Sequence, residues 1–380
     1  MSSDLQPLSP AEAREMYLED RADSVRDATL QAHHYRTKAF VKFCDAHGID
    51  NLNDLTGRDL HAFKRERGED LAATSLQSQL STLRQFLRFC RDIDGVPSGL
   101  PEKVRPPTPE DTSRDTRVTG EQAEAILDRL SKFDYASRDH ALFLTAWHTA
   151  ARIGGLRALD LGHVHLDDPE QPHLQYRHSE ATPLKNGSDG QRDVAISDGV
   201  ARVLRDYIDE RRVSQTVDGR EPLFTTNHGR ISEGWLRRTM YKVTRPCWTG
   251  TCPHDRDPDD CEAVQNREKI ASCPSARPPH DVRRGSMSDH LQRGWPIEQL
   301  SERVDATPRV IRKHYDVREA RESMLTRSAL LDDHDRDMTQ GNSERSENRR
   351  EDISDRSDVG LISDGSVRVG RRPLERGCQL

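Results

Sequence analysis

The sequence predicts a mainly helical (α+β) protein of two domains, with one small antiparallel sheet in the second domain. Apolar residues recur at helical spacing along much of 10–92 and 120–315. A segment rich in proline, threonine and charge separates these stretches at 101–116 and predicts a linker. With 380 residues, the chain is long enough for each domain to bury a core.

The first domain, at 8–100, is predicted to be entirely helical. It opens with Ser9-Pro-Ala-Glu12, where serine caps the helix, proline takes its first position and glutamate completes a capping box. The last helix carries apolar residues at helical spacing from Leu76 to Cys90. Helices are expected over about 10–20, 27–47, a short stretch after Thr56, and 73–92.

The second domain, at 117–330, is predicted to combine helices with a small sheet. It begins at Thr119-Gly-Glu-Gln. Extended segments are expected at about 164–166, 173–178 and 192–196, with Lys185-Asn-Gly-Ser-Asp-Gly as a turn before the last of them. Helices are expected over about 120–131, 137–149, 198–213, 232–243, 280–293, 296–304 and 308–315.

The C-terminal segment, 331–380, is predicted to be a disordered tail. It holds 12 acidic residues and nine arginines among serine and other polar residues, with few apolar ones. Such a composition cannot bury enough apolar surface to offset the entropy of folding.

Four positions in the second domain carry functional groups in a suggestive order. Arg152 lies where one apolar helix ends and another, Ile153-Gly-Gly-Leu, begins, so its side chain projects from a turn. His280 and Arg283 open a later helix one turn apart and therefore share a face. The helix N-terminus there also favours an anion. Tyr315 stands at the end of the short helix that begins at Thr307-Pro308.

These residue types suit phosphodiester cleavage without a metal ion. Two guanidinium groups can hold the non-bridging oxygens of one phosphate, and a tyrosine can attack its phosphorus. A proton donor is needed as well, because an alkoxide is a poor leaving group near pH 7. Lys185, on the turn before the last extended segment, is the sole lysine between Lys132 and Lys242.

The order Arg152, Lys185, His280-x-x-Arg283 and Tyr315 resembles the active site of the tyrosine recombinase (phage integrase) family. The resemblance implies that the two arginines hold the scissile phosphate while the tyrosine forms a 3′-phosphotyrosyl link. It implies that the lysine protonates the 5′-oxygen and that the histidine assists proton transfer. No cofactor takes part in this chemistry.

The resemblance extends over about residues 8–325 and implies the rest of the architecture. The first domain resembles the family's helical core-binding (SAM-like) DNA-binding domain, and the second resembles its catalytic domain. A site-specific recombinase or integrase acts on double-stranded DNA at specific recombination sites. Its protomers, four per synapse in this family, assemble on the DNA as a homo-oligomer.

The sequence departs from the family pattern at three places. Ala150 replaces the glycine of the first arginine motif, and Gly155 replaces an acidic residue three positions after Arg152. Asp305 and Ala306 stand where the family has Gly-His or Gly-Trp before the tyrosine. The last two changes remove a supporting carboxylate and a third hydrogen-bonding side chain, which His314 or Asp305 could partly replace. We therefore expect slower chemistry, or a different residue in that role, in preference to lost chemistry.

The charge of the chain predicts an unusual environment. The net charge is −7, from 65 acidic and 58 basic residues, which by itself argues mildly against a nucleic-acid partner. Only nine of the basic residues are lysines, a pattern that suggests adaptation to high salt, although GC-rich coding would also favour arginine. In molar salt the Debye length is about 3 Å, so such a protein would bind DNA through short-range hydrogen bonds.

The chain has no run of about 18 apolar residues and no apolar N-terminal signal, which predicts a cytoplasmic protein without a membrane partner. It has seven cysteines, and without a secretory signal a disulfide framework is not expected.

A cysteine-rich segment at 246–278 looks like an insertion between two helices of the second domain. We expect four of its side chains to hold a structural Zn²⁺ that would order this polar loop. The ligands would be Cys252, Cys261 and Cys273, with Cys247 or His254 as the fourth. Reduced thiols in a flexible loop are the alternative.

Three other functions stay open at this stage. The departures at Gly155 and Ala306 would suit a catalytically weak DNA-binding relative that acts as a regulator. A type IB-like nicking and relaxing enzyme would share the chemistry without synapsis. An interaction module built on the cysteine-rich segment would not depend on Tyr315.

Overall fold

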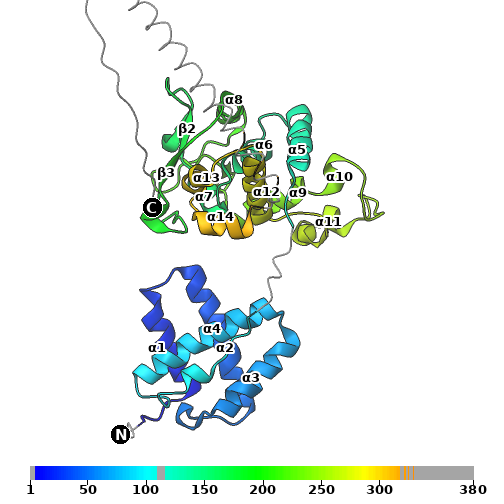
Figure 1. Cartoon of the computed structure of the whole chain (residues 1–380). Helices are drawn as coiled ribbons and strands as arrows, with labels where there is room; N and C mark the ends of the chain where they lie inside the picture. Colours follow the sequence, from blue (N-terminus) through cyan, green and yellow to red (C-terminus); the bar gives the residue numbers. More distant parts are fainter. Residues whose placement is uncertain (1–4, 109–115, 317–320, 322–323, 325–327, 329–380) are drawn as a thin grey trace, which may run out of the picture. The chain divides into compact units, whose positions relative to one another are not determined.

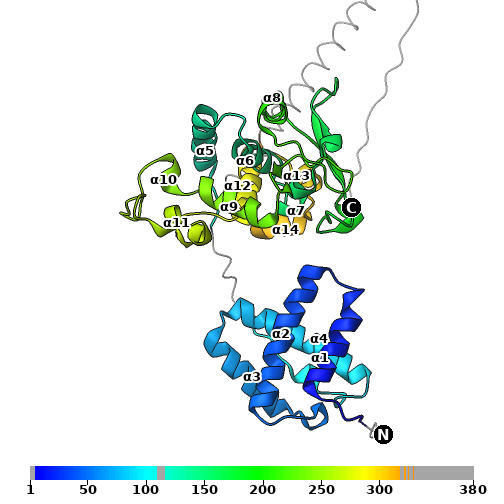
Figure 2. The ribbon, with the colours of Figure 1, turned by 180° about the vertical axis from the view of Figure 1, so that it is seen from behind.

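The structure is a computed structural model that describes residues 5–108 and 116–316, together with residues 321, 324 and 328. The chain divides into two compact units, Met1–Asp115 and Thr116–Leu380. Both are mostly helical, and small antiparallel sheets occur in the second, so the predicted fold class is confirmed (Figures 1 and 2). The predicted tail at 331–380 lies outside the described residues.

The first unit is a group of four helices around an aromatic core. The ring of Phe40 lies 5.3 Å from that of Phe63 and 6.1 Å from that of Phe86, measured between centroids. The hydroxyl of Tyr17 meets His33 Nδ1 at 2.9 Å inside the same core. The helices are α1 (Pro10–Ala22), α2 (Asp27–Ala46), α3 (Gly57–Asp70) and α4 (Ala73–Asp92).

The start of the predicted linker belongs to the first unit. Pro101–Lys103 forms a 3-10 turn that packs on α4. Val104 is buried, and its carbonyl oxygen accepts a hydrogen bond from Arg84 Nε at 3.0 Å. Residues 101–104 are therefore part of the first unit, and the linker begins later in the described structure than the composition suggested.

The second unit opens with three helices and a three-stranded sheet. The strands pair in the order β1-β2-β3, all antiparallel, and Tyr176 on β2 stands opposite Arg192 on β3. The helices are α5 (Gly120–Phe133), α6 (Arg138–Thr149) and α7 (Ile153–Ala158). The strands are β1 (Val164–His165), β2 (His173–Tyr176) and β3 (Arg192–Ala195).

Helices make up most of the rest of the second unit. α8 (Asp198–Asp206) continues into a π-helical turn, Tyr207–Arg211, and a two-stranded hairpin follows, β4 (Thr225–Thr226) and β5 (Gly229–Arg230). The remaining helices are α9 (Glu233–Val243), α10 (Pro246–Thr249), α11 (Glu262–Gln265), α12 (Pro279–Gln292), α13 (Ile297–Val304) and α14 (Pro308–His314).

In both views of the second unit, the β2–β3 sheet and the α10–α11 region lie at opposite ends, with α12 between them (Figures 1 and 2). Its main core joins α5, α6, α8 and α9 to the inner face of the sheet. A smaller apolar cluster joins α12, α13 and α14 to the end of α6 and includes Ala150, Met287, Ile311 and Tyr315. Elements distant in the sequence thus meet around α12.

The cysteine-rich segment is closed at its base. The backbone N–H of Arg277 donates to Thr244 Oγ1 at 2.8 Å, and that hydroxyl donates in turn to the carbonyl oxygen of Met240 on α9 at 2.7 Å. Inside the segment, the buried Arg245 side chain donates to the carbonyl oxygen of Ala263 at 2.6 Å. The segment therefore leaves and rejoins the fold at one point. No helix in the described ranges is long and apolar enough to cross a membrane.

Candidate active site

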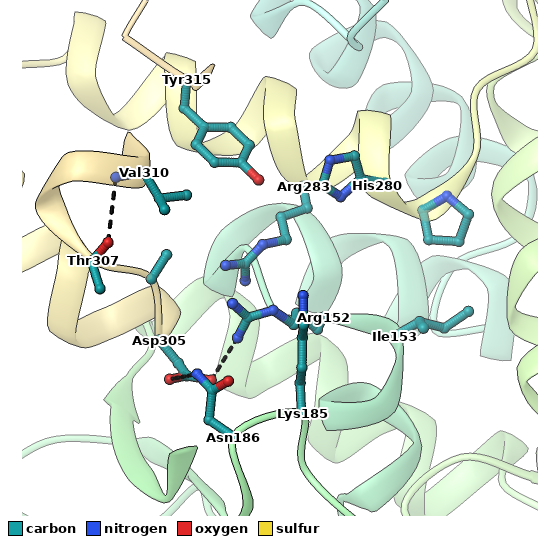
Figure 3. Close-up of a pocket in the computed structure, with 12 residues that line it drawn as sticks. Arg152, Ile153, Lys185, Asn186, His280, Arg283, Asp305, Thr307, Val310 and Tyr315 are labelled. Carbon is teal, nitrogen blue, oxygen red and sulfur yellow. Dashed lines mark hydrogen bonds and ion pairs between the residues drawn. The ribbon is translucent and has the colours of Figure 1, made fainter. Parts of the chain in front are cut away.

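All five residues predicted to be catalytic line one cavity of about 430 Å³ in the second unit. They come from four places in the fold: the start of α7, the β2–β3 connection, α12 and the end of α14. Their functional groups face one another in Figure 3. The residues are Arg152, Lys185, His280, Arg283 and Tyr315.

Arg152 reaches the cavity from a sharp turn between α6 and α7. Ala150 ends α6 in the left-handed conformation, with φ 48° and ψ 31°, and Arg152 caps α7 in an extended conformation. This reversal aims the arginine away from the main core. Its Nη1 donates to Oδ2 of Asp305 at 2.5 Å, and its side chain is 25% exposed.

Arg283 is the deepest of the five side chains, at 3% exposure. Its Nη1 donates to the carbonyl oxygen of Ala150, and its Nη2 donates to that of Val304 at 2.8 Å. Burial, reinforced by the nearby charge of Arg152, lowers the pKa of Arg283 to about 10. It therefore stays protonated at neutral pH and adds a fixed positive charge to the cavity.

His280 lies on the first turn of α12, beside Tyr315. Their ring centroids are 6.2 Å apart with an edge-on arrangement. Burial lowers the pKa of His280 below its usual 6.5, and the charge of Arg283 lowers it further. The imidazole is therefore neutral near pH 7, a state in which one ring nitrogen can accept a proton.

Tyr315 is held as part of a small core while its hydroxyl faces the cavity. The residue is 7% exposed and packs with Ile311 and Met287 in the smaller apolar cluster. Its carbonyl oxygen accepts a hydrogen bond from Ser288 Oγ of α12 at 2.8 Å. In Figure 3 the hydroxyl points toward Arg283 and His280. The ring is thus fixed by packing, and its oxygen is directed at the guanidinium of Arg283 and the imidazole of His280.

Lys185 is exposed on the long connection between β2 and β3, and its side chain extends toward Arg152 (Figure 3). The next residue, Asn186, donates from Nδ2 to Oδ1 of Asp305 at 2.8 Å. The connection carrying the lysine is therefore fastened to the turn after α13.

The structure shows what surrounds each of the three departures from the family pattern. A Cβ on Gly155 would lie 3.2 Å from Cδ1 of Tyr176, so the buried ring of that tyrosine fills the space of a longer side chain. Ala150 adopts a left-handed conformation that glycine would adopt more readily. Ala306 lines the cavity with a methyl group, which can donate no hydrogen bond.

Asn186 was not predicted to belong to the site, and Asp305 was expected only as a partial replacement for a missing hydrogen-bonding side chain. The two residues are 119 positions apart, and their contact depends on the left-handed turn at Asp305. An asparagine next to the candidate lysine was the sole local signal.

The predicted zinc ligands do not form a metal site in the described structure. Cys261 and Cys273 pack together in a small apolar cluster, and His254 Nε2 lies 3.0 Å from Ser275 Oγ. Within 5–108 and 116–316, no group of three or more His, Cys, Asp or Glu side chains is arranged to hold a metal ion. The structural Zn²⁺ stays a prediction.

The first unit carries a polar face on α2 and α4. Tyr35 on α2 is 62% exposed and lines a shallow cavity with Arg36, Ser75 and Ser78. Two other polar side chains of α4 are engaged inside the unit: Gln79 accepts from Arg67 Nε at 3.1 Å, and Arg84 binds the carbonyl oxygen of Val104.

Comparison with known proteins agrees with this architecture. Residues 16–92 match the family model of the phage integrase N-terminal SAM-like domain. No curated protein matches the chain. The chain is also similar to the N-terminal domain of a phage integrase/site-specific recombinase (tnp) from Haloarcula marismortui, with 36% identity over 27% of this chain and 99% of that one and a TM-score of 0.26.

Two solved integrases share the fold of most of the chain. The Tn1549 transposon integrase in complex with transposon right end DNA has 11% identity, covers 85% of this chain and 100% of that one, and gives a TM-score of 0.60. A lambda integrase dimer bound to a COC' core site has 13% identity, covers 83% of this chain and 79% of that one, and gives a TM-score of 0.59. A lambda integrase tetramer bound to a Holliday junction has 13% identity, covers 80% of this chain and 75% of that one, and gives a TM-score of 0.56.

The N-terminal domain match and the fold of both units lead to one conclusion. Residues 16–92 belong to the phage integrase N-terminal SAM-like domain family, and most of the chain has the fold of the solved integrases.

Proposed function

We propose that this protein is a site-specific DNA recombinase that cuts and rejoins strands through a 3′-phosphotyrosyl intermediate. The observation that carries the proposal is the convergence of a tyrosine hydroxyl, two arginines, a histidine and a lysine on one cavity. A phosphodiester placed there would meet a nucleophile, a charge clamp and a proton donor together.

The cleavage step follows from this arrangement. The Tyr315 oxygen forms a bond to phosphorus as the bond from phosphorus to the 5′-oxygen breaks. The phenolic proton goes to the neutral imidazole of His280, directly or through water, and Lys185 gives a proton to the departing 5′-oxygen. A 5′-hydroxyl from a second strand reverses these steps, so the energy of the phosphodiester is kept in the phosphotyrosyl ester.

The arginines stabilise the charge that develops at phosphorus. Arg283 is fixed by two main-chain carbonyls and still carries further N–H groups, while Arg152 uses one nitrogen on Asp305. Groups fixed before the reaction need no reorganisation as charge builds up. Double-stranded DNA with specific sites is the proposed substrate.

We also propose that protomers assemble on DNA, with four in a synapse. Strand exchange requires two paired sites, each cut by its own nucleophiles. The solved relatives include an integrase dimer on a core site and an integrase tetramer on a Holliday junction. Those assemblies support the proposal by analogy.

Trapping the covalent intermediate tests the proposal. The protein is incubated in high-salt buffer with a nicked suicide substrate built from its native flanking DNA, beside Tyr315→Phe and a control, Tyr135→Phe. Tyr135 is 41% exposed and does not line the cavity. We expect an SDS-stable adduct with the wild type and the control, and none with Tyr315→Phe.

A regulator that binds DNA without cutting it is the second candidate, favoured by the methyl group of Ala306 in the cavity. Specific binding of the same substrate without an adduct, under conditions in which a related enzyme reacts, would support it against the recombinase.

A further inference from the structure

Asp305 binds two residues that approach the cavity from different elements. Its Oδ2 accepts from Arg152 Nη1 at 2.5 Å, and its Oδ1 accepts from Asn186 Nδ2 at 2.8 Å. Both carboxylate oxygens are therefore used, one on a candidate phosphate ligand and one on the neighbour of Lys185. Figure 3 shows the carboxylate between the two partners at the edge of the cavity.

The backbone around Asp305 brings its side chain to this place. The residue ends α13 in the left-handed conformation, with φ 54° and ψ 57°. Such a conformation is unfavourable for a residue with a Cβ, and aspartate is among the residues that accept it. The preceding carbonyl, of Val304, is bound by Arg283. The turn is thus held from the main chain as well as from the side chain.

The connection between β2 and β3 is shaped to pass close to this carboxylate. A Cβ on Gly190 would lie 3.2 Å from Asp305 Oδ2, which is tighter than ordinary contact. The glycine therefore leaves room for the carboxylate beside the chain. Arg192, at the start of β3, donates to the carbonyl oxygen of Arg303 at 2.7 Å and draws the same two segments together.

Asp305 offsets part of the positive charge of the cavity. Arg152, Lys185 and Arg283 are three cations on one wall, and Asp305 is the sole acid among the residues that line the cavity in the described structure. The carboxylate meets one Nη of Arg152 and leaves the rest of its guanidinium directed into the cavity. It can hold the arginine while a phosphate is bound, since the guanidinium has five N–H donors.

Position 155, where the family has an acidic residue, has no room for a carboxylate side chain. Gly155 lies one turn along α7 from Arg152, but the buried ring of Tyr176 occupies the space beside it. Tyr176 is fixed there, because its hydroxyl donates to Thr149 Oγ1 at 3.0 Å and Arg192 stacks over its ring. A carboxylate for Arg152 has to come from elsewhere, and Asp305 supplies it.

We propose that Asp305 is a positioning residue: it fixes the guanidinium of Arg152 and, through Asn186, couples the Lys185 connection to it before DNA binds. The proposal rests on the proposed function, because it assigns Asp305 a part in the same site. Its consequence is that the phosphate clamp and the proton donor are assembled together, so loss of the carboxylate loosens both.

The first test is a double-mutant cycle on the rate of adduct formation, at saturating protein on the suicide substrate. Asp305→Asn should slow cleavage about 10- to 100-fold, because a misplaced group loses its orientation. In an Arg152→Ala background the same change should cost several-fold less, because the contact with Arg152 is already absent and only the contact with Asn186 is lost. DNA affinity should change little in each variant.

The matched control is Glu298→Gln, which removes an acid that pairs with Arg312 at the protein surface, 2.9 Å away, outside the cavity. It should leave the rate unchanged. Equal losses from Asp305→Asn in both backgrounds would show that the residue does not act through Arg152. Faster cleavage or tighter DNA binding by Asp305→Asn would mean that the carboxylate competes with the phosphate, and would also overturn the proposal.

A second test uses the free full-length protein and needs no activity. Trypsin cleaves after lysine, so the rate of cutting between Lys185 and Asn186, followed by mass spectrometry, reports how firmly the connection is held. Asp305→Asn and Asn186→Ala should each increase this rate several-fold, and Glu298→Gln should not. An unchanged rate in both variants would overturn the coupling.

The two measurements separate the failure of the inference from that of the proposed function. A wild type that forms no adduct would refute the recombinase, while the trypsin rates would still decide the coupling. A wild type that reacts, with Asp305→Asn equal to it, would refute the inference alone. Asn186→Ala changes an exposed side chain, so it tests the coupling even if an Asp305 variant folds poorly.

Discussion

Arg283 donates a hydrogen bond to the carbonyl oxygen of Ala150, two residues before Arg152. Its second donor goes to the carbonyl oxygen of Val304, directly before Asp305. One buried guanidinium thus joins the turns that carry Arg152 and its acidic partner. This arginine is a structural cross-link as well as a candidate ligand of the phosphate.

That double role predicts a large stability cost for Arg283→Ala. The change removes a side chain that is 3% exposed and leaves two buried carbonyls without these donors, so the free energy of unfolding should fall by about 3 kcal/mol. Arg152→Ala, at a side chain 25% exposed, should cost about 1 kcal/mol. Urea unfolding followed by circular dichroism measures both, and equal costs would contradict the cross-link.

Lys185 should be needed only when the leaving oxygen needs a proton. Lys185→Ala should cleave an ordinary suicide substrate slowly, yet react at close to the wild-type rate when sulfur replaces the 5′-bridging oxygen. A thiol has a pKa of about 8.5, so a thiolate leaves without a general acid. Quenched-flow assays with both substrates check this. A defect of the same size with sulfur would assign the lysine to another role.

Gly285 should tolerate no side chain. A Cβ there would lie 1.9 Å from the carbonyl oxygen of Val118, whose N–H donates to the carbonyl oxygen of Asp281 at 3.3 Å. Gly285→Ala should therefore lower the free energy of unfolding by about 3 kcal/mol. The matched control is Gly234→Ala on α9, where a Cβ would meet only side-chain atoms at 3.7 Å or more. The control should be neutral or stabilising in the same urea titration.

His148 should make the second unit sensitive to acid. Burial, followed by the charges of Arg303 and His290, lowers the pKa of His148 from 6.5 to about 4. Because the unfolded chain binds this proton at higher pH than the folded one, stability is complete above pH 6.5 and is lost as the pH falls toward 4.

At pH 5 the loss from this histidine alone is about 2 kcal/mol. His148→Leu should reduce the difference in unfolding free energy between pH 7.5 and pH 5 by that amount. Urea titrations at the two pH values measure it. An unchanged difference in the variant would show that other groups carry the acid sensitivity.

The sequence predicted the helices and strands of the described structure closely, because their ends depend on local chemistry. Thr119 forms a full capping box with Gln122 at the start of α5, and Thr307 caps α14 just before its proline. The order of polar residues along the chain was also sufficient to predict the five that line the cavity, since the family resemblance supplied their roles.

The support around those residues could not be predicted in the same way. The contact between Arg152 and Asp305 spans 153 positions and depends on a left-handed turn at an aspartate, which has no strong sequence signal. The ring that fills the space beside Gly155 belongs to Tyr176, and its place depends on the register of β2 with β3. Such pairings follow from the packed fold and have no local pattern.

The closed base of the cysteine-rich segment has a consequence for how this fold can vary. Since Thr244 and Arg277 hold the two ends of the segment together, the chain between them can lengthen or shorten at its tip while α9 and α12 keep their spacing. The tip of the segment is therefore a site at which a foreign domain could be inserted without moving His280 or Arg283.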